Sequence, residues 1–196
     1  RAFDRGEAEQ ALAWFKQAWA IDPTRLPALG DAGWAALRLG DIPAAISIWE
    51  QGIAAGVSRP ADWMIWIAGA LDADGRLDAA LETTEQALRV NPASAAAREW
   101  KTYLLLKTHR GDELEAWWQN RDGSPSDDPL IRGVVRFADS REKAGAAVRL
   151  LDPLRARDPV FHARLVSEIY TALALQAEGR DKVEYLRVAA ENEPGH

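Results

Sequence analysis

The chain has 196 residues, which is long enough for one or two compact domains or for an elongated array of repeats. Its formal net charge of −6 argues against general nucleic-acid binding, because neutralising phosphates requires clustered Lys and Arg, and the sequence has no such cluster. The absence of cysteine excludes disulfides and thiolate metal sites. It leaves the compartment open, either the cytoplasm or a bacterial periplasm.

The chain begins with Arg1 rather than Met, and Arg1 to Arg5 are typical of the end of a helix whose beginning is absent. We therefore expect a piece of a longer protein. The next helix carries Leu12, Phe15 and Trp19 on one stripe that would lack half of its packing surface. Since an exposed apolar stripe usually marks a contact, this incomplete first unit predicts self-association or cover by another chain.

The segment from Leu26 to Val57 predicts a helix, a tight turn and a second helix. The first helix carries one apolar stripe and the second, which begins at Ile42-Pro43, carries another. The two stripes comprise Leu29, Ala32, Gly33 and Ala36, then Ala45, Ile46, Trp49, Gly52 and Ile53. A glycine inside a helix costs about 1 kcal/mol relative to alanine, so Gly33 indicates a close helix contact.

Glycine marks a repeat along the first part of the chain. Four glycines lie 34, 35 and 36 residues apart, and each is followed five residues later by alanine. The pairs are Gly6/Ala11, Gly40/Ala45, Gly75/Ala80 and Gly111/Ala116. This pattern predicts a turn glycine with positive φ and then a helix whose small residue allows close approach. The apolar run from Trp63 to Leu71 predicts a buried helix, since a membrane span requires roughly 20 residues.

The C-terminal half is less regular. Trp100, Tyr103 and Leu104 predict a first helix, and a second runs from Glu113 to about Gln119. Further helices are expected from Pro129 to about Phe137, after Ser140 with a break or kink at Pro153, over residues 160–177, and over residues 181–193. The expected organisation is repeats over residues 1–120, a polar loop over 121–128 and degenerate repeats over 129–196.

These features resemble the tetratricopeptide repeat, a helix-turn-helix unit of 34 residues with small residues where its helices cross. Residues 5–23 match its second half, Leu29, Gly33, Gly40, Ala45 and Trp49 match a whole unit, and Met64, Ala68, Gly75, Ala80 and Ala87 match a third, with Thr84 in place of the usual aromatic. The resemblance implies an all-α, right-handed α-solenoid that is degenerate towards the C-terminus. It also implies a fragment of a larger, bacterial-type protein.

No catalytic or metal site is predicted. The three histidines, His109, His162 and His196, are scattered and have no acidic neighbours at ligand spacing. Asp72-Ala-Asp74-Gly75 is similar to the start of a calcium loop, but Arg76 and Leu77 occupy positions that the loop needs for a ligand and a glycine. No nucleophile elbow or phosphate-binding loop is present, so we expect no cofactor.

Tryptophan is unusually frequent, with nine residues. Trp49 and Trp100 fall where the family has buried aromatics. Trp34 faces away from the stripe of its helix and is either a binding residue or a core residue. In tetratricopeptide arrays the first helices line a concave face that binds peptides, so the resemblance implies a groove of Asp31, Trp34, Arg38, Asp62, Trp66, Asp72, Arg98, Lys101 and His109.

Three functions remain open from the sequence. The first is a non-enzymatic scaffold that binds a peptide or partner protein in this groove. The second is the helical periplasmic region of an envelope, exopolysaccharide-export or secretion protein. The third is a non-catalytic helical domain of a larger enzyme, or a carbohydrate-binding surface that uses exposed tryptophan.

Overall fold

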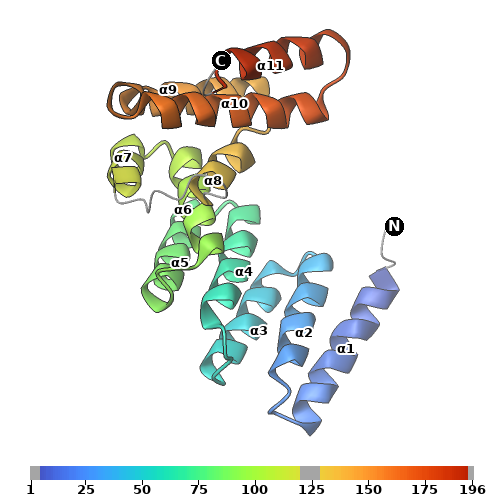
Figure 1. Ribbon diagram of the computed structural model, residues 1–196. Coiled ribbons are helices and arrows are strands. Elements are labelled where there is room, and N and C mark those ends of the chain that lie inside the picture. The colour runs from blue at the N-terminus through green and yellow to red at the C-terminus, as the bar shows by residue number, and fades with distance from the viewer. Residues whose placement is uncertain (1–4, 120–128, 194–196) are drawn as a thin grey trace. The chain divides into compact units, whose positions relative to one another are not determined.

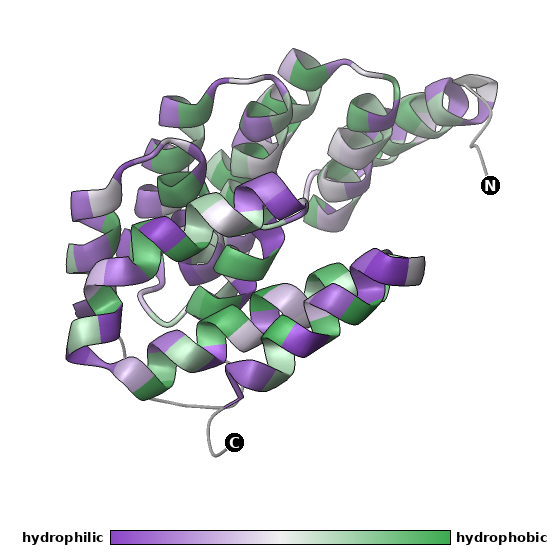
Figure 2. Ribbon diagram, turned by 90° about the horizontal axis from the view of Figure 1, so that it is seen from above, coloured by the Kyte–Doolittle hydropathy of each residue, from purple (hydrophilic) through white to green (hydrophobic). Residues whose placement is uncertain are grey.

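The computed structural model describes residues 5–119 and 129–193, and within these ranges every regular element is an α-helix (Figure 1). The helices are α1 (Arg5–Ile21), α2 (Leu26–Arg38), α3 (Ile42–Ala54), α4 (Pro60–Ala73), α5 (Leu77–Val90), α6 (Ala95–Lys107), α7 (Gly111–Gln119), α8 (Pro129–Phe137), α9 (Arg141–Arg157), α10 (Pro159–Gln176) and α11 (Gly179–Glu191). The predicted all-α helical-repeat fold is confirmed. Figure 2 shows hydrophobic and hydrophilic residues alternating along these helices, which lets each helix bury one side.

The chain divides into two compact units, Arg1–Ala97 and Arg98–His196. The division falls inside α6, whereas the sequence predicted a loop at 121–128, which lies outside the described residues. Within the described ranges no helix is both long and apolar enough to cross a lipid bilayer.

In the first unit each helix packs on the next, from α1 to α5. Local chemistry sets the boundary between α2 and α3. Gly40 adopts a φ of 79°, a left-handed conformation that favours glycine, and ends α2. The Asp41 carboxylate then accepts a hydrogen bond of 3.0 Å from the Ala44 backbone N–H and caps α3. Pro43 lies in the first turn of α3, where its missing N–H has no helical partner to lose. The predicted helix-turn-helix over residues 26–57 is therefore confirmed.

Only two of the four repeat glycines are left-handed turn residues. Gly75 has a φ of 77° and matches Gly40, but Gly6 lies in the first turn of α1 and Gly111 is the first residue of α7. The prediction of a positive φ at Gly6 and Gly111 is wrong. The reason is that α1 already begins at Arg5, and that His109, with a φ of 56°, is the left-handed residue between α6 and α7.

Two glycines in the first unit make room for tryptophan rings from neighbouring helices. A Cβ atom on Gly33 would overlap the indole of Trp49, and one on Gly52 would overlap the ring of Trp63. Trp49 is fully buried, and its Nε1 donates a hydrogen bond of 3.2 Å to the backbone oxygen of Gly30. The close contact expected at Gly33 is thus between the backbone of α2 and the indole of Trp49.

We predict that Gly33→Leu destabilises the protein by about 1–3 kcal/mol, because the new side chain competes with Trp49 for the same volume. Thermal and urea unfolding measure the effect. Gly145→Ala is the control, since a Cβ atom there meets only the end of the Arg149 side chain at 3.5 Å and alanine favours a helix. Equal melting temperatures for Gly33→Leu and the parent chain would contradict the packing described here.

In the second unit α10 packs against α8, α9 and α11, and α7 packs against α9. Ser140 caps α9 as predicted, accepting from the Lys143 N–H at 3.3 Å. Of the predicted break or kink at Pro153, the break is wrong, because α9 continues through Pro153 to Arg157, and the kink stays a prediction. Proline removes one hydrogen bond, and the buried side of the helix, held by Ala147 and Leu151, does not depend on it.

A buried histidine lies in α10. His162 is 7% exposed, and among the described residues its Nε2 has no hydrogen-bond partner. Burial lowers the pKa of His162 below its ordinary value of 6.5, and the positive charge of Arg155 lowers it further, while Asp152 opposes the shift. The folded state therefore favours the neutral ring.

This shift predicts a loss of stability on acidification. Below pH 6.5 the unfolded chain binds a proton at His162 more readily than the folded chain does, so the free energy of unfolding falls as the pH drops from 6.5 towards the lowered pKa. Urea unfolding of the parent chain and of His162→Gln over this range measures the effect, with His109→Gln as a control at an exposed ring. Parallel pH profiles for the parent and His162→Gln would contradict the prediction.

Candidate functional site

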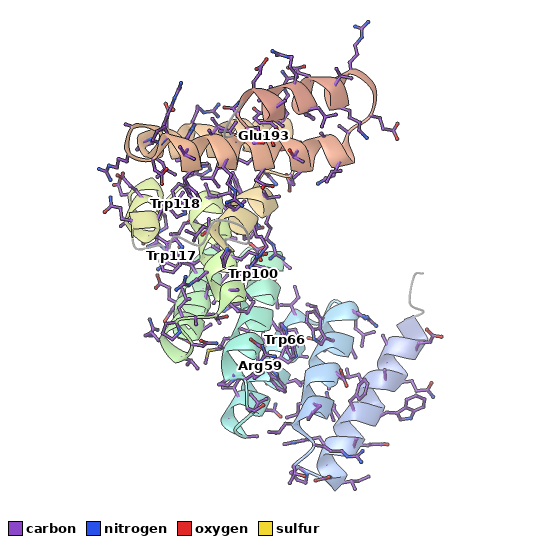
Figure 3. All side chains as sticks on the ribbon, viewed as in Figure 1. Arg59, Trp66, Trp100, Trp117, Trp118 and Glu193 are labelled. Carbon is purple, nitrogen blue, oxygen red and sulfur yellow. The ribbon has the colours of Figure 1, made fainter. Side chains whose placement is uncertain are left out.

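Four tryptophans from three consecutive helices form a cluster in the first unit. Trp34 of α2 contacts Trp49 of α3 edge-on, with ring centroids 5.2 Å apart, and Trp66 of α4 at 5.6 Å. Trp49 and Trp66 lie 5.9 Å apart, and Trp63 stacks on Trp66 at 5.4 Å. Figure 3 shows Trp66 between α4 and α2. We call these four residues the tryptophan cluster.

Exposure changes across the cluster. Trp49 and Trp63 are buried, Trp66 is half-buried and Trp34 is 40% exposed. Aromatic pairs of this kind contribute roughly 0.5–1.5 kcal/mol beyond the area that they bury. Trp34 is therefore held by two neighbouring indoles while a large part of its surface stays accessible.

The accessible part of Trp34 lines a cavity of about 250 Å³ between α1 and α2. The remaining lining residues are Ala8, Ala11 and Phe15 of α1 and Asp31, Ala35 and Arg38 of α2. We call this cavity the Trp34 pocket. Its walls are apolar, and its two charged side chains, Asp31 and Arg38, are both exposed. An apolar floor with a charged rim is the composition of a protein-binding hot spot.

The structure brings together three of the predicted groove residues. Asp31, Trp34 and Arg38 occupy positions i, i+3 and i+7 of α2 and all line the Trp34 pocket. Trp66 does not line the pocket, but its ring contacts Trp34, which does. Asp62 does not line it; this residue lies in the first turn of α4 and pairs with Arg59 at 2.8 Å.

The other predicted groove residues lie elsewhere. Asp72 is half-buried near the end of α4 and does not line the pocket. Arg98, Lys101 and His109 belong to the second unit. There the Lys101 ammonium lies 4.7 Å from the ring centroid of Trp117, Arg98 is half-buried in α6, and His109 is exposed in the turn before α7.

The second unit has its own aromatic and basic contacts. The Arg136 guanidinium lies 4.2 Å from the ring centroid of Trp100 and pairs with Glu99 at 2.9 Å. Arg132 pairs with the same carboxylate at 3.1 Å. Trp49 is buried as predicted, whereas Trp100 is only half-buried, although the Arg136 guanidinium covers part of its ring.

Sequence reasoning missed the α1 wall of the pocket. It placed Phe15 on an uncovered stripe with Leu12 and Trp19, but all three are half-buried, and α1 packs against α2. The stripe is therefore partly covered and partly exposed. The i, i+3, i+7 spacing of Ala8, Ala11 and Phe15 is the signal that could have placed them on one side of the helix.

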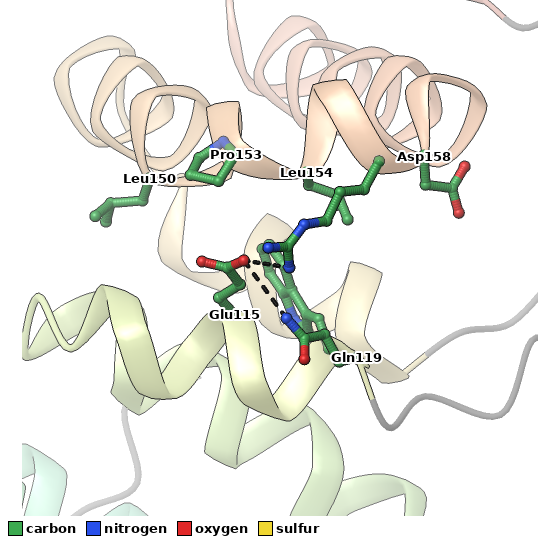
Figure 4. A pocket seen from close by; sticks show the side chains of 8 residues that line it. Glu115, Gln119, Leu150, Pro153, Leu154 and Asp158 are labelled. Atoms are coloured by element: carbon green, nitrogen blue, oxygen red, sulfur yellow. Dashed lines mark hydrogen bonds and ion pairs between the residues drawn. The ribbon is translucent and has the colours of Figure 1, made fainter.

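A second cavity of about 240 Å³ lies in the second unit between α7 and α9 (Figure 4). Trp118, Leu150, Pro153 and Leu154 form its apolar walls. Its polar residues are engaged: Arg157 pairs with Glu115, the Gln119 amide donates to Glu115 at 3.5 Å, and the Asp158 carboxylate accepts from the Phe161 N–H at 3.0 Å. Because its polar groups satisfy one another, this cavity offers a ligand few recognition contacts.

Among residues 5–119 and 129–193, no three His, Asp or Glu side chains lie close enough together to hold a metal ion.

Comparisons with known proteins bear on the fold. A tetratricopeptide-repeat family model matches residues 2–64. No curated protein sequence matches the chain. Among solved structures, BtubC from P. vanneervenii is similar with a TM-score of 0.50 and 12% identity, over 96% of this chain and 89% of that one. At this identity the likeness concerns the fold alone.

Two further solved structures are similar at slightly lower scores. MamA gives a TM-score of 0.49 and 16% identity, over 95% of this chain and 89% of that one. YrrB, described as a TPR protein with an unusual peptide-binding site, gives 0.48 and 19%, over 97% of this chain and 80% of that one.

Proposed function

We propose that the first unit, whose residues 2–64 match the tetratricopeptide-repeat model, is a binding module that holds a segment of a partner protein in the Trp34 pocket. The observation that carries this proposal is the position of Trp34. Its ring is restrained by Trp49 and Trp66 and is still 40% exposed beside an apolar cavity. An aromatic side chain that is already ordered loses little entropy when a ligand covers it.

The size of the pocket favours a protein segment over a small molecule. Small-molecule sites usually enclose about 300–1,000 Å³. The Trp34 pocket measures about 250 Å³ and is bounded by only two helices, so it suits a single bulky side chain of a longer segment. The flanking residues of that segment would then lie over the rim, next to Asp31 and Arg38.

Trp34→Ala tests this function. Peptides selected from a displayed random library on the immobilised chain should lose affinity for this variant by at least about 2 kcal/mol, or roughly thirtyfold in Kd. Fluorescence anisotropy with the selected peptides measures the loss. Trp14→Ala is the matched control, because Trp14 is 60% exposed on α1 and does not line the pocket.

Circular dichroism and thermal unfolding separate binding from folding. Trp34→Ala also removes ring contacts with Trp49 and Trp66, so we expect a lower melting temperature but a helical, cooperative chain. A variant that is strongly destabilised, yet binds the peptides with unchanged affinity in its folded fraction, would make Trp34 a core residue and overturn the proposal.

Self-association through α1 is a second candidate function. Trp14 and Ile21 are 60% and 85% exposed, and their seven-residue spacing places them on the same side of the helix. We expect concentration-dependent association in sedimentation experiments, and we expect Trp14→Ser/Ile21→Ser to abolish it. Leu175→Ser, at an exposed apolar residue of α10, is the control. A clean monomer at high concentration would contradict this candidate.

A further inference from the structure

We propose that the Trp34 pocket selects an extended segment in which an apolar side chain is flanked by one basic and one acidic residue, about three residues apart. This inference rests on the proposed function. It goes further by defining the chemistry of the partner from the two charges of the rim.

The rim charges come from a single helix and have opposite signs. Asp31 and Arg38 lie seven residues apart on the side of α2 that lines the pocket. At a rise of 1.5 Å per residue, their backbone positions are separated by about 10 Å along the helix. An extended chain advances roughly 3.3 Å per residue, so about three residues of a bound segment cover the same distance.

The opposite wall adds no charge. The α1 residues that line the pocket are Ala8, Ala11 and Phe15, so α2 alone supplies the two charged lining residues. Trp34 lies between them in the sequence, three residues after Asp31 and four before Arg38. An apolar side chain packed against Trp34 is therefore flanked by a carboxylate on one side and a guanidinium on the other.

The size of the charge effect can be estimated from exposure. Asp31 and Arg38 are both exposed, and exposed ion pairs contribute only about 0.2–1 kcal/mol. Each rim charge should therefore change Kd by about 1.4- to fivefold at low salt and less at high salt. The apolar contact with Trp34 supplies most of the affinity, and the rim charges supply selectivity.

A bound segment can lie in either direction along the rim, so the test changes the sign of one charge at a time. The full chain, Asp31→Lys and Arg38→Glu are each used to select from the same displayed random peptide library. We expect the full chain to enrich an apolar residue with one basic and one acidic flank. Asp31→Lys should enrich two acidic flanks, and Arg38→Glu two basic flanks.

Three synthetic peptides are then compared: one with a basic and an acidic flank, one with two acidic flanks and one with two basic flanks. Fluorescence anisotropy measures their Kd values at low and high salt. Each variant should prefer its own peptide by about 1.4- to fivefold at low salt. Lys16→Glu and Glu50→Lys are matched controls, since both reverse an exposed charge of the first unit outside the pocket lining and should keep the original preference. Asp31→Asn and Arg38→Gln give the neutral comparison.

The outcomes separate this inference from the proposed function. If the selected peptides require Trp34 but carry the same flanking residues whichever variant selected them, the charge selectivity is overturned and the binding function stands. Failure to enrich any peptide whose binding requires Trp34 would overturn both.

Discussion

The first unit depends on the fit between tryptophan rings and glycine backbones. Trp49 occupies the space beside Gly33, Trp63 occupies the space beside Gly52, and the Trp49 indole donates to the Gly30 carbonyl. An indole is the largest apolar side chain and buries up to about 250 Å². At these two places the ring leaves no room for a Cβ atom on the facing residue. The glycines therefore decide where the rings lie, and the rings set the positions of α2, α3 and α4.

This packing also explains how a rigid aromatic surface reaches the solvent. The cluster extends from the buried Trp49 and Trp63 through Trp66 to Trp34, whose outer part borders a cavity. A single exposed tryptophan on a helix would be free to change rotamer. Here two ring contacts restrain Trp34, so a partner would meet a surface that is already ordered. The same side chain can thus stabilise the fold and remain available for binding.

The helices of the second unit pack through a different set of contacts. Its close approach is at Gly133, where a Cβ atom would overlap the backbone oxygen of Glu99, and the Glu99 carboxylate pairs with Arg132 and Arg136. Arg136 in turn covers the ring of Trp100. Aromatic and charged groups here satisfy one another within the unit. The Trp34 pocket, by comparison, combines apolar walls with an exposed charged rim.

The sequence by itself determined the features that depend on near neighbours along the chain. The turn at Gly40, the Asp41 cap and the first-turn Pro43 are local, and so is the shared side of Asp31, Trp34 and Arg38, because a helix has a fixed period. Only the tertiary structure decided that the apolar stripe of α1 is partly covered by packing against α2, that Phe15 forms a pocket wall and that Gly52 accommodates Trp63. These contacts join residues of different helices, and which side chain fills a given space depends on the volumes of all its neighbours at once.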